Sequence, residues 1–132
     1  MGTHSLIVMR FKRNNNYDVY CKLYQQFDGY LNGVGKTLID FLLSITLVNG
    51  ITGEGNEANG AGCLFAQIIK LFKKRVGGSY IVDPNSNHEE AYMYYVDVDE
   101  NSRTMEIGIE EDGGISFRGS LEQASQLINP PN

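Results

Sequence analysis

The glycine-rich stretch DGYLNGVGKT, residues 28–37, ends in Gly-Lys-Thr, as the phosphate-binding loop of nucleotide hydrolases does. In that loop a further glycine stands five residues before the glycine of Gly-Lys-Thr, because this spacing lets the backbone amides wrap the phosphates. Tyr30 occupies the required position, and Gly29 lies one residue too early. The preceding run 17–27 also alternates in polarity, whereas a strand leading into such a loop is continuously apolar. The stretch is therefore not a nucleotide-hydrolase loop.

Glycine-rich turns that lead into helices offer a second chemistry, because the free amides of a first helical turn attract anions. Two turns of this kind precede predicted helices, and together they contain Gly33, Gly35, Lys36, Asn59 and Gly62. Should the two helix starts converge, they would form one pocket of the size of a phosphate or a carboxylate. Ordinary tight turns capped by glycine and asparagine are the alternative interpretation.

The stretch YQQFDGY, residues 24–30, combines amide, carboxylate and aromatic side chains at the exit of a predicted strand. Gln26 and Asp28 are suited to polar edges of a ligand, and Tyr30 offers a flat surface for stacking. Gln67, one turn into the second predicted helix, is expected to close such a site. The same composition also suits an ordinary protein–protein contact, and the sequence leaves both interpretations open.

A nucleophile is the next chemistry to consider. Cys63 stands at the predicted start of a helix, a setting that activates thiols, and His88 is available as a base. However, His88 lies in a turn of Asn, Ser and Glu residues, and no third group that would orient it is identifiable. Asp28 is a second weak candidate. We therefore assign no catalytic residue and keep Cys63 and His88 as weak candidates only.

The sequence predicts no metal site and no cofactor. His4 and His88 have no partners at the spacing of a zinc site. The run 97–108 begins like a calcium loop, but Ser102 stands where the sharp turn needs glycine and Gly108 where a bidentate glutamate belongs. A hairpin turn rich in acidic residues is the better interpretation of this run.

Composition limits the classes of partner. The chain has 132 residues and a formal net charge of −5, which argues against broad nucleic-acid binding. A local basic patch is nevertheless present at Lys70, Lys73, Lys74 and Arg75. Two cysteines make no disulfide framework, and no apolar run reaches the roughly 18 residues of a membrane span. We expect a cytoplasmic protein, in the host cytoplasm if it is encoded by a phage, with no membrane contact.

Hydrophobic periodicity predicts an α+β fold, with an antiparallel sheet of about six strands covered on one face by two central helices and with a short C-terminal helix. A single domain is expected over 1–129, with a loose tail at 130–132. In the second strand, Tyr17, Val19, Cys21, Leu23 and Phe27 are expected to share one face. Ser120 and Gln123 are spaced as a capping box for the last helix. The predicted strands cover 5–13, 17–27, 79–84, 90–99, 103–111 and 114–120; the predicted helices cover 36–45, 63–76 and 120–128, with a long loop over 46–62.

Several of these motifs occur together in a pattern that resembles an uncharacterised family of small proteins from bacteriophage, viral and bacterial genomes. The motifs are GTHSLI, then YQQFDGYLNGVG, then ANGAGCLFAQ, in this order, and the resemblance covers about residues 2–82. Gln25 replaces an arginine of the pattern, Leu31 a proline and Val34 a histidine. The resemblance brings no activity. It implies a phage-type accessory protein, a class that often acts by blocking a host factor or by sequestering nucleotide signals of host defence.

Three functions follow as hypotheses. The first is a non-enzymatic protein that binds a small anionic, nucleotide-like ligand through the 26–37 loop and the 59–63 helix start. The second is an inhibitor of a host protein that acts through a tyrosine-bearing face of the sheet. The third is a small hydrolase or transferase that uses Cys63 or Asp28 with His88. A homo-oligomer is expected, because exposed strands rich in tyrosine are ready to pair or pack.

Overall fold

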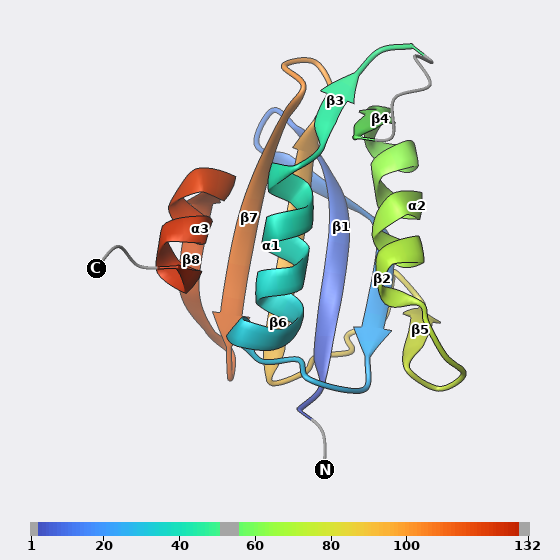
Figure 1. Cartoon of the computed structure of the whole chain (residues 1–132), viewed down its shortest axis with the longest axis vertical. Coiled ribbons are helices and arrows are strands. Elements are labelled where there is room, and N and C mark those ends of the chain that lie inside the picture. The colour runs from blue at the N-terminus through green and yellow to red at the C-terminus, as the bar shows by residue number, and fades with distance from the viewer. Residues whose placement is uncertain (1–2, 51–55, 130–132) are drawn as a thin grey trace.

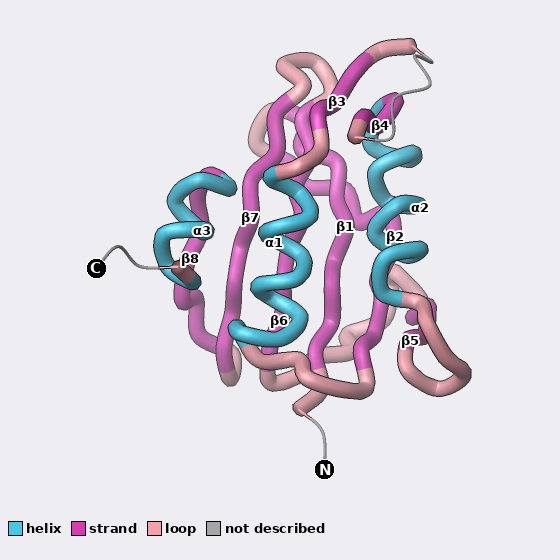
Figure 2. The backbone as a smooth tube through the Cα atoms, viewed as in Figure 1, coloured by secondary structure: helices cyan, strands magenta, loops and turns pink. Residues whose placement is uncertain are grey.

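Runs of alternating polarity form one six-stranded sheet in the computed structural model, which describes residues 3–50 and 56–129 (Figures 1 and 2). The strand order is β5-β2-β1-β6-β7-β8. All neighbours are antiparallel except β1 and β6, which run parallel. The strands are β1 (Ser5–Arg13), β2 (Asn16–Gln25), β5 (Ser79–Val82), β6 (Tyr92–Asp99), β7 (Thr104–Glu111) and β8 (Gly114–Ser120). The predicted α+β class with a largely antiparallel sheet is confirmed.

Three helices cover one face of this sheet, which we call the helix face (Figure 2). They are α1 (Lys36–Leu43), α2 (Gly60–Phe72) and α3 (Leu121–Ile128), and a π-helical turn, η1 (Leu31–Gly35), leads directly into α1. None of the helices in the described ranges is long and apolar enough to cross a membrane. The predicted long loop over 46–62 is wrong at both ends. It contains the short parallel strands β3 (Thr46–Val48) and β4 (Glu57–Asn59), and α2 begins at Gly60.

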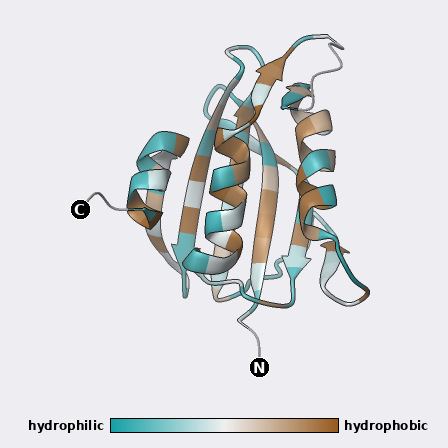
Figure 3. Cartoon of the chain, viewed as in Figure 1, coloured by the Kyte–Doolittle hydropathy of each residue, from teal (hydrophilic) through white to brown (hydrophobic). Residues whose placement is uncertain are grey.

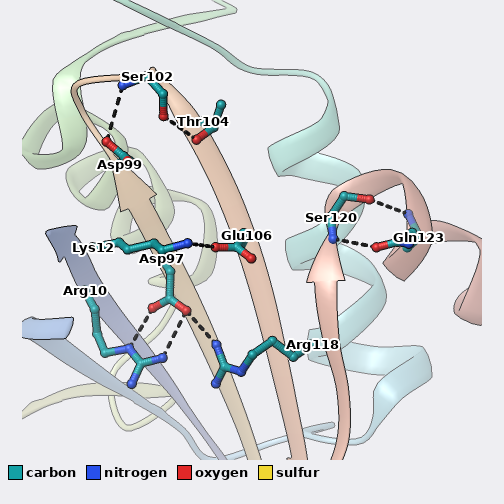
Figure 4. Close-up of polar contacts among 10 residues, drawn as sticks. All are labelled: Arg10, Lys12, Asp97, Asp99, Ser102, Thr104, Glu106, Arg118, Ser120 and Gln123. Atoms are coloured by element: carbon teal, nitrogen blue, oxygen red, sulfur yellow. Dashed lines mark hydrogen bonds and ion pairs between the residues drawn. The ribbon is translucent and has the colours of Figure 1, made fainter. Parts of the chain in front are cut away.

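The main core lies between the helices and the central strands. Leu38, Ile39 and Leu42 of α1 are fully buried, because their helical spacing puts them on one side of the helix. They pack with the inward residues of β1 and β6, and Figure 3 shows hydrophobic bands on the β1 and α1 ribbons in the middle of the molecule. The predicted capping box is confirmed at α3, where Gln123 N donates to Ser120 Oγ over 3.1 Å and Ser120 N donates to Gln123 Oε1 over 3.0 Å (Figure 4).

A β-bulge corrects the predicted face of the second strand. Met9 pairs with Cys21 but Arg10 pairs with Val19, so Tyr20 is the extra residue in β2. Cys21 and Leu23 therefore face the helices, as expected, whereas Tyr17 and Val19 lie on the opposite, helix-free face. A prediction from strict alternation assigns every second residue of a strand to the same face. A single extra residue reverses this assignment for the rest of the strand.

The helix-free face, which we call the open face, is partly covered by the connection 83–91. β5 and β6 are separated in the sheet by β2 and β1, so this connection crosses both strands. Lys22 Nζ donates to the carbonyl oxygen of Ser86 over 2.8 Å, and the His88 ring meets the ring of Tyr24 edge-on. The crossing explains why Leu6 and Val8 are buried although no helix covers them.

Tyr94 of β6 supports the loop that joins β2 to η1. Its side chain is fully buried, and its hydroxyl donates to the carbonyl oxygen of Gly29 over 2.8 Å. Burial is the main cause that raises the pKa of Tyr94. Because the unfolded chain would lose this proton first, near the ordinary tyrosine value of about 10, folding stability falls as the pH rises above that value.

Replacing Tyr94 by Phe keeps the buried ring and removes the hydroxyl. The Gly29 carbonyl then loses its buried donor, so the free energy of unfolding should fall by about 1–3 kcal/mol. Urea unfolding followed by circular dichroism measures the change. Tyr92→Phe is the matched control, because the Tyr92 hydroxyl makes no hydrogen bond within the described residues, and its midpoint should stay near that of the wild type. Equal losses in the two variants would contradict the assigned hydrogen bond.

Candidate functional site

The first predicted anion site, at the start of α1, uses its backbone amides internally. Val34 N donates to the carbonyl oxygen of Asp28 over 2.8 Å, and Gly33 N donates to that of Tyr30 over 2.9 Å. Gly35 N also points to the Tyr30 carbonyl, at 3.4 Å. The π-helical turn thus pairs the donors that a free helix start would offer to an anion.

Gly33 is needed here because two segments of backbone nearly touch. A Cβ atom at this position would lie 2.1 Å from the carbonyl oxygen of Asp28, a distance that no side chain tolerates. The glycine pattern of 28–37 therefore has a structural reason, which is the close return of the chain onto Asp28.

The predicted ligand side chains of this loop also have partners. Lys36 Nζ donates to Asp40 Oδ2 and to Asn129 Oδ1, both over 3.0 Å. Tyr30 Oη lies 3.4 Å from Asp28 Oδ1. Gln26 accepts from the Tyr24 hydroxyl over 2.9 Å, and its amide nitrogen lies 3.1 Å from Nε2 of His4. The Gln26 contacts join the loop to the sheet, and the Lys36 contacts join the start of α1 to its next turn and to the end of α3.

The second predicted anion site, at the start of α2, holds a carboxylate of the chain itself. Glu100, in the turn between β6 and β7, accepts from the backbone amide of Ala61 over 2.9 Å. Asn59 and Glu100 both line a cavity of about 280 Å³ at this end of the molecule. Asn59 Oδ1 accepts from the Gly50 amide over 3.0 Å. Glu100, a carboxylate of the chain itself, thus takes the place that was predicted for the anion of a ligand at this helix start.

The other two predicted residues on α2 point to different surroundings. Gly62 is exposed, with no atom near the position of a Cβ. Gln67 Nε2 donates to the carbonyl oxygen of Glu57 over 3.1 Å, so this side chain fastens α2 to β4. Its buried Oε1 has no partner among the described residues.

The two helix starts lie at opposite ends of the molecule and do not form one pocket (Figure 1). Gly29 N bonds to Thr3, just before β1, whereas Ala61 N bonds to Glu100, just after β6. β1 and β6 run parallel between these points, and a strand of this length spans roughly 25 Å at about 3.3 Å per residue. The combined 26–37 and 59–63 pocket is therefore not present.

Cys63 and His88 are also kept apart. Cys63 is an exposed residue of α2, on the helix face, whereas His88 packs on Tyr24 on the open face. His88 Nε2 pairs with Glu90. The described residues also contain no group of three or more His, Cys, Asp and Glu side chains that could hold a metal ion. The structure thus brings together no nucleophile and base from the predicted pair.

A different cavity combines the aromatic, amide and basic side chains that were noted separately in the sequence. It has a volume of about 310 Å³ and lies where the end of β2 meets the end of α2 and the turn into β5. We call it the basic pocket. Its lining residues are Gln25, Phe27, Phe72, Lys74, Arg75 and Gly78.

Hydrogen bonds to backbone carbonyl oxygens hold the walls of the basic pocket together. Gln26 N donates to the carbonyl oxygen of Gly78 over 3.0 Å, which joins the end of β2 to the turn before β5. Lys73 Nζ donates to the carbonyl oxygens of Arg75 and Ser79, over 3.0 and 3.1 Å, and so closes the turn after α2. Lys73 is thereby a structural residue, while Lys74 and Arg75 stay exposed beside the cavity.

The electrostatics of this end differ from those of the whole chain. Lys70, Lys73, Lys74 and Arg75 are exposed, and within residues 3–50 and 56–129 none of them forms an ion pair with a carboxylate. The guanidinium of Arg75 lies over the Phe27 ring, 4.3 Å from its centre. Four cations without carboxylate partners in the described residues, gathered in a protein of net charge −5, make a local anion-attracting surface.

Gln25 contributes an unsatisfied polar group to the same cavity. Its side chain is only 5% exposed, and its Oε1 accepts from Ser79 Oγ over 2.8 Å. Its buried Nε2 has no hydrogen-bond partner among residues 3–50 and 56–129. Buried polar groups are nearly always paired, so this amide nitrogen is an exception in the wall of the cavity.

Sequence reasoning missed the basic pocket because its parts lie far apart along the chain. The YQQF run and the KKR run were each visible as a motif. Only the pairing of β2 with β5, in which Gln25 stands opposite Ser79, brings the two runs together. The sequence did show one basic cluster and one cluster of aromatic and amide side chains. Pairing these two clusters would have predicted the pocket.

Comparisons with protein-family models, with curated proteins and with solved structures find no match for this chain. The resemblance noted from the motifs therefore stays a prediction. Any assignment of function depends on the residues and their geometry.

Replacing Glu100 by Ala tests the internal anion at the start of α2. The change removes a charged acceptor from the first turn of a helix, so the free energy of unfolding should fall by about 1 kcal/mol. Urea unfolding measures it. Glu89→Ala is the control, because Glu89 is exposed and makes no hydrogen bond or ion pair in the described residues. If Glu100→Ala unfolds at the same urea concentration as the control, Glu100 does not cap α2.

Proposed function

We propose that the protein is a non-enzymatic binding protein whose basic pocket takes a small ligand with a planar group and an anionic group, such as a nucleotide. The observation that carries this proposal is the meeting of cations without carboxylate partners and an aromatic-walled cavity at one end of α2. The ligand class is the one predicted from the sequence. The location differs from the predicted one. None of the predicted ligand-binding residues lines the basic pocket, although Gln25 and Phe27 belong to the 24–30 stretch.

The aromatic wall supports a planar ligand. Phe27 is 42% exposed, although large apolar side chains are usually buried. Its ring already receives the flat guanidinium of Arg75 on one side, which shows that its face is accessible to a planar cation. A base or similar ring would stack on the part of the Phe27 ring that stays exposed beside Arg75, because aromatic faces accept offset stacking.

The cations support an anionic group on that ligand. Helix C-termini attract cations through the helix dipole, and this alone accounts for Lys70 in the last turn of α2. Lys74 and Arg75 follow the end of the helix at Phe72, and their charged groups make no bond to the helix carbonyls. Their charges are free to meet a phosphate or a carboxylate.

The size of the cavity supports a small ligand. A volume of about 310 Å³ is at the lower end of the roughly 300–1,000 Å³ that ligand pockets occupy. A mononucleotide matches this volume better than a dinucleotide does. Gln25 lines the cavity and has an unpaired side-chain amide nitrogen, and polar groups of this kind give a pocket its specificity.

The proposed biological role rests on the resemblance to phage-type accessory proteins. We propose that binding sequesters the ligand and so counters host defence signalling, in the host cytoplasm. Homo-oligomer formation stays a prediction. The separation of Cys63 from His88 favours binding over turnover.

Isothermal titration calorimetry with 5′-AMP and with adenosine tests the proposal. AMP should bind, and adenosine should bind roughly tenfold more weakly or worse, because a charge-assisted hydrogen bond is worth about 1.5–3 kcal/mol. Lys74→Gln and Arg75→Gln should weaken AMP by a similar factor. Lys70→Gln is the matched control, since Lys70 is an exposed cation of α2 that does not line the cavity.

Two further arms separate binding from catalysis and from non-specific attraction. Cys63→Ser and His88→Ala should leave AMP affinity unchanged, and chromatography should recover AMP intact after incubation. A loss of affinity in Lys70→Gln equal to that in Lys74→Gln would reduce the effect to general electrostatics. An absence of heat with AMP, GMP, CMP and UMP up to about 1 mM, the weak end of specific binding, would contradict the proposal.

A further inference from the structure

The connection 83–91, which we call the strap, crosses β2 and β1 on the open face and covers an apolar patch. The patch consists of Leu6, Val8 and Met93, which are 0%, 2% and 7% exposed although no helix lies over them. The strap itself contains no helix or strand. Its place over the patch therefore depends on the contacts that its side chains and carbonyl oxygens make with the sheet.

Both histidines of the chain lie against one carboxylate of the strap, that of Glu90. His88 Nε2 pairs with Glu90 Oε2, and Nδ1 of His4, which precedes β1, lies 3.6 Å from Glu90 Oε1. The Tyr24 ring of β2 meets both imidazoles edge-on, with its centre 5.5 Å from that of His4 and 5.8 Å from that of His88. The Glu90 side chain is only 16% exposed, so water screens its charge less than that of a fully exposed carboxylate.

The two imidazoles differ in how freely they take up a second proton. The Nδ1 atom of His88 has no partner within the described residues, and the ring is 38% exposed, so it gains a proton without breaking its bond to Glu90. The Nε2 atom of His4 lies 3.1 Å from Nε2 of Gln26. Because Gln26 Oε1 accepts from the Tyr24 hydroxyl, its Nε2 is the donor to His4, and a proton on that ring atom would break the bond. His88 is therefore the ring that becomes charged without rearrangement.

The other charged and titratable groups around the strap leave this pairing undisturbed. Lys22 Nζ donates to the carbonyl oxygen of Ser86 over 2.8 Å and so fastens the strap by a bond that does not change near neutral pH. Within residues 3–50 and 56–129, the Glu90 carboxylate pairs only with the two imidazoles. Burial raises the pKa of Tyr24, and the charge of Glu90 raises it further. The charged and titratable side chains of the strap and of the elements packed against it include Lys22, Tyr24, Tyr80, Glu89, Tyr95 and Asp112.

We propose that the strap is a pH-sensitive cover, held by His88 and Glu90, which tightens as the pH falls through the histidine range of about 8 to 5. The neutral His88 ring holds Glu90 through one hydrogen bond, and the charged ring adds electrostatic attraction to the same contact. This attraction exists only while the strap is closed. Its contribution to closure is therefore present at the acid end of the range and is lost as the pH rises, when the strap opens more often and uncovers the patch.

Hydrogen exchange of the backbone amides of 84–90, followed by mass spectrometry at about pH 5.5 and about pH 8, tests this inference. After correction for the intrinsic exchange rate at each pH, the wild-type strap should be protected roughly two- to fivefold more at the lower pH, as expected of a partly exposed ion pair. His88→Gln keeps a hydrogen-bond donor beside Glu90 but gains no proton. Its strap should match the wild type at the higher pH and show no rise in protection at the lower one.

Three further variants separate the proposed switch from a fixed structural contact. Glu90→Gln removes the charge that the imidazole responds to, so the pH response should disappear. Glu89→Gln is the matched control, because Glu89 is an exposed neighbour that makes no hydrogen bond or ion pair in the described residues, and it should keep the full response. His4→Gln should keep most of it, because His4 stays engaged with Gln26.

Urea unfolding at the same two pH values gives an independent measure. Because the chain has only two histidines, the unfolding constant of the wild type, relative to that of His88→Gln, should fall by roughly two- to fivefold from the higher to the lower pH. The inference is overturned if the wild-type strap is equally protected at both pH values, or if the response persists in His88→Gln or Glu90→Gln. Loss of the response in Glu89→Gln would also overturn it, since the effect would then be one of general charge.

Discussion

The parallel pairing of β1 with β6 is the contact on which the rest of the structure depends. It joins the N-terminal hairpin to the C-terminal meander, and its residues facing the helices, such as Ile7, Met9, Val96 and Val98, are completely buried. The register sets Arg10 directly beside Asp97 and Ile7 beside Tyr94. A slip by one residue would turn Asp97 into the apolar core and remove Tyr94 from beneath Gly29. The ion pairs that Asp97 makes with Arg10 and Arg118 on the open face, and the support that Tyr94 gives to Gly29, thus have one common origin.

This central pair also explains where binding groups remain available. Helices close one face, and the 83–91 connection closes part of the other, so free polar groups are left at the rim of the sheet. The short strand β5 is decisive there. Its pairing with the end of β2 builds the basic pocket at Gln25, and its early end leaves the remaining edge of β2 open. One short strand therefore builds the basic pocket and also leaves residues 16–21 of β2 without a partner strand on that side in the described part of the chain.

Local patterns in the sequence predicted most of the fold, because alternation and helical spacing report directly on which residues are buried. The capping box at Ser120 was predicted to the residue. The bulge at Tyr20, the π-helical turn before Lys36 and the parallel pairing were not visible, since each depends on contacts with distant segments. The binding site was harder to predict from the sequence than the fold. Gly33 and Gly35 suggested anion binding. In the structure Gly33 allows the close approach of the Asp28 backbone, and Gly35 packs against the Tyr94 ring. α1 and α2 run in opposite directions, so their starts lie at opposite ends of the molecule. Composition alone does not reveal these directions.

Native mass spectrometry of the purified protein, followed by heat release and analysis of any small molecule set free, tests the central claim that the basic pocket binds a planar anionic ligand. We predict a protein mass above that of the 132-residue chain by one mononucleotide-sized molecule, which is absent from Lys74→Gln. The same run reports the oligomeric state. A mass equal to that of the chain alone, unchanged after adding an excess of mononucleotides, would contradict the claim.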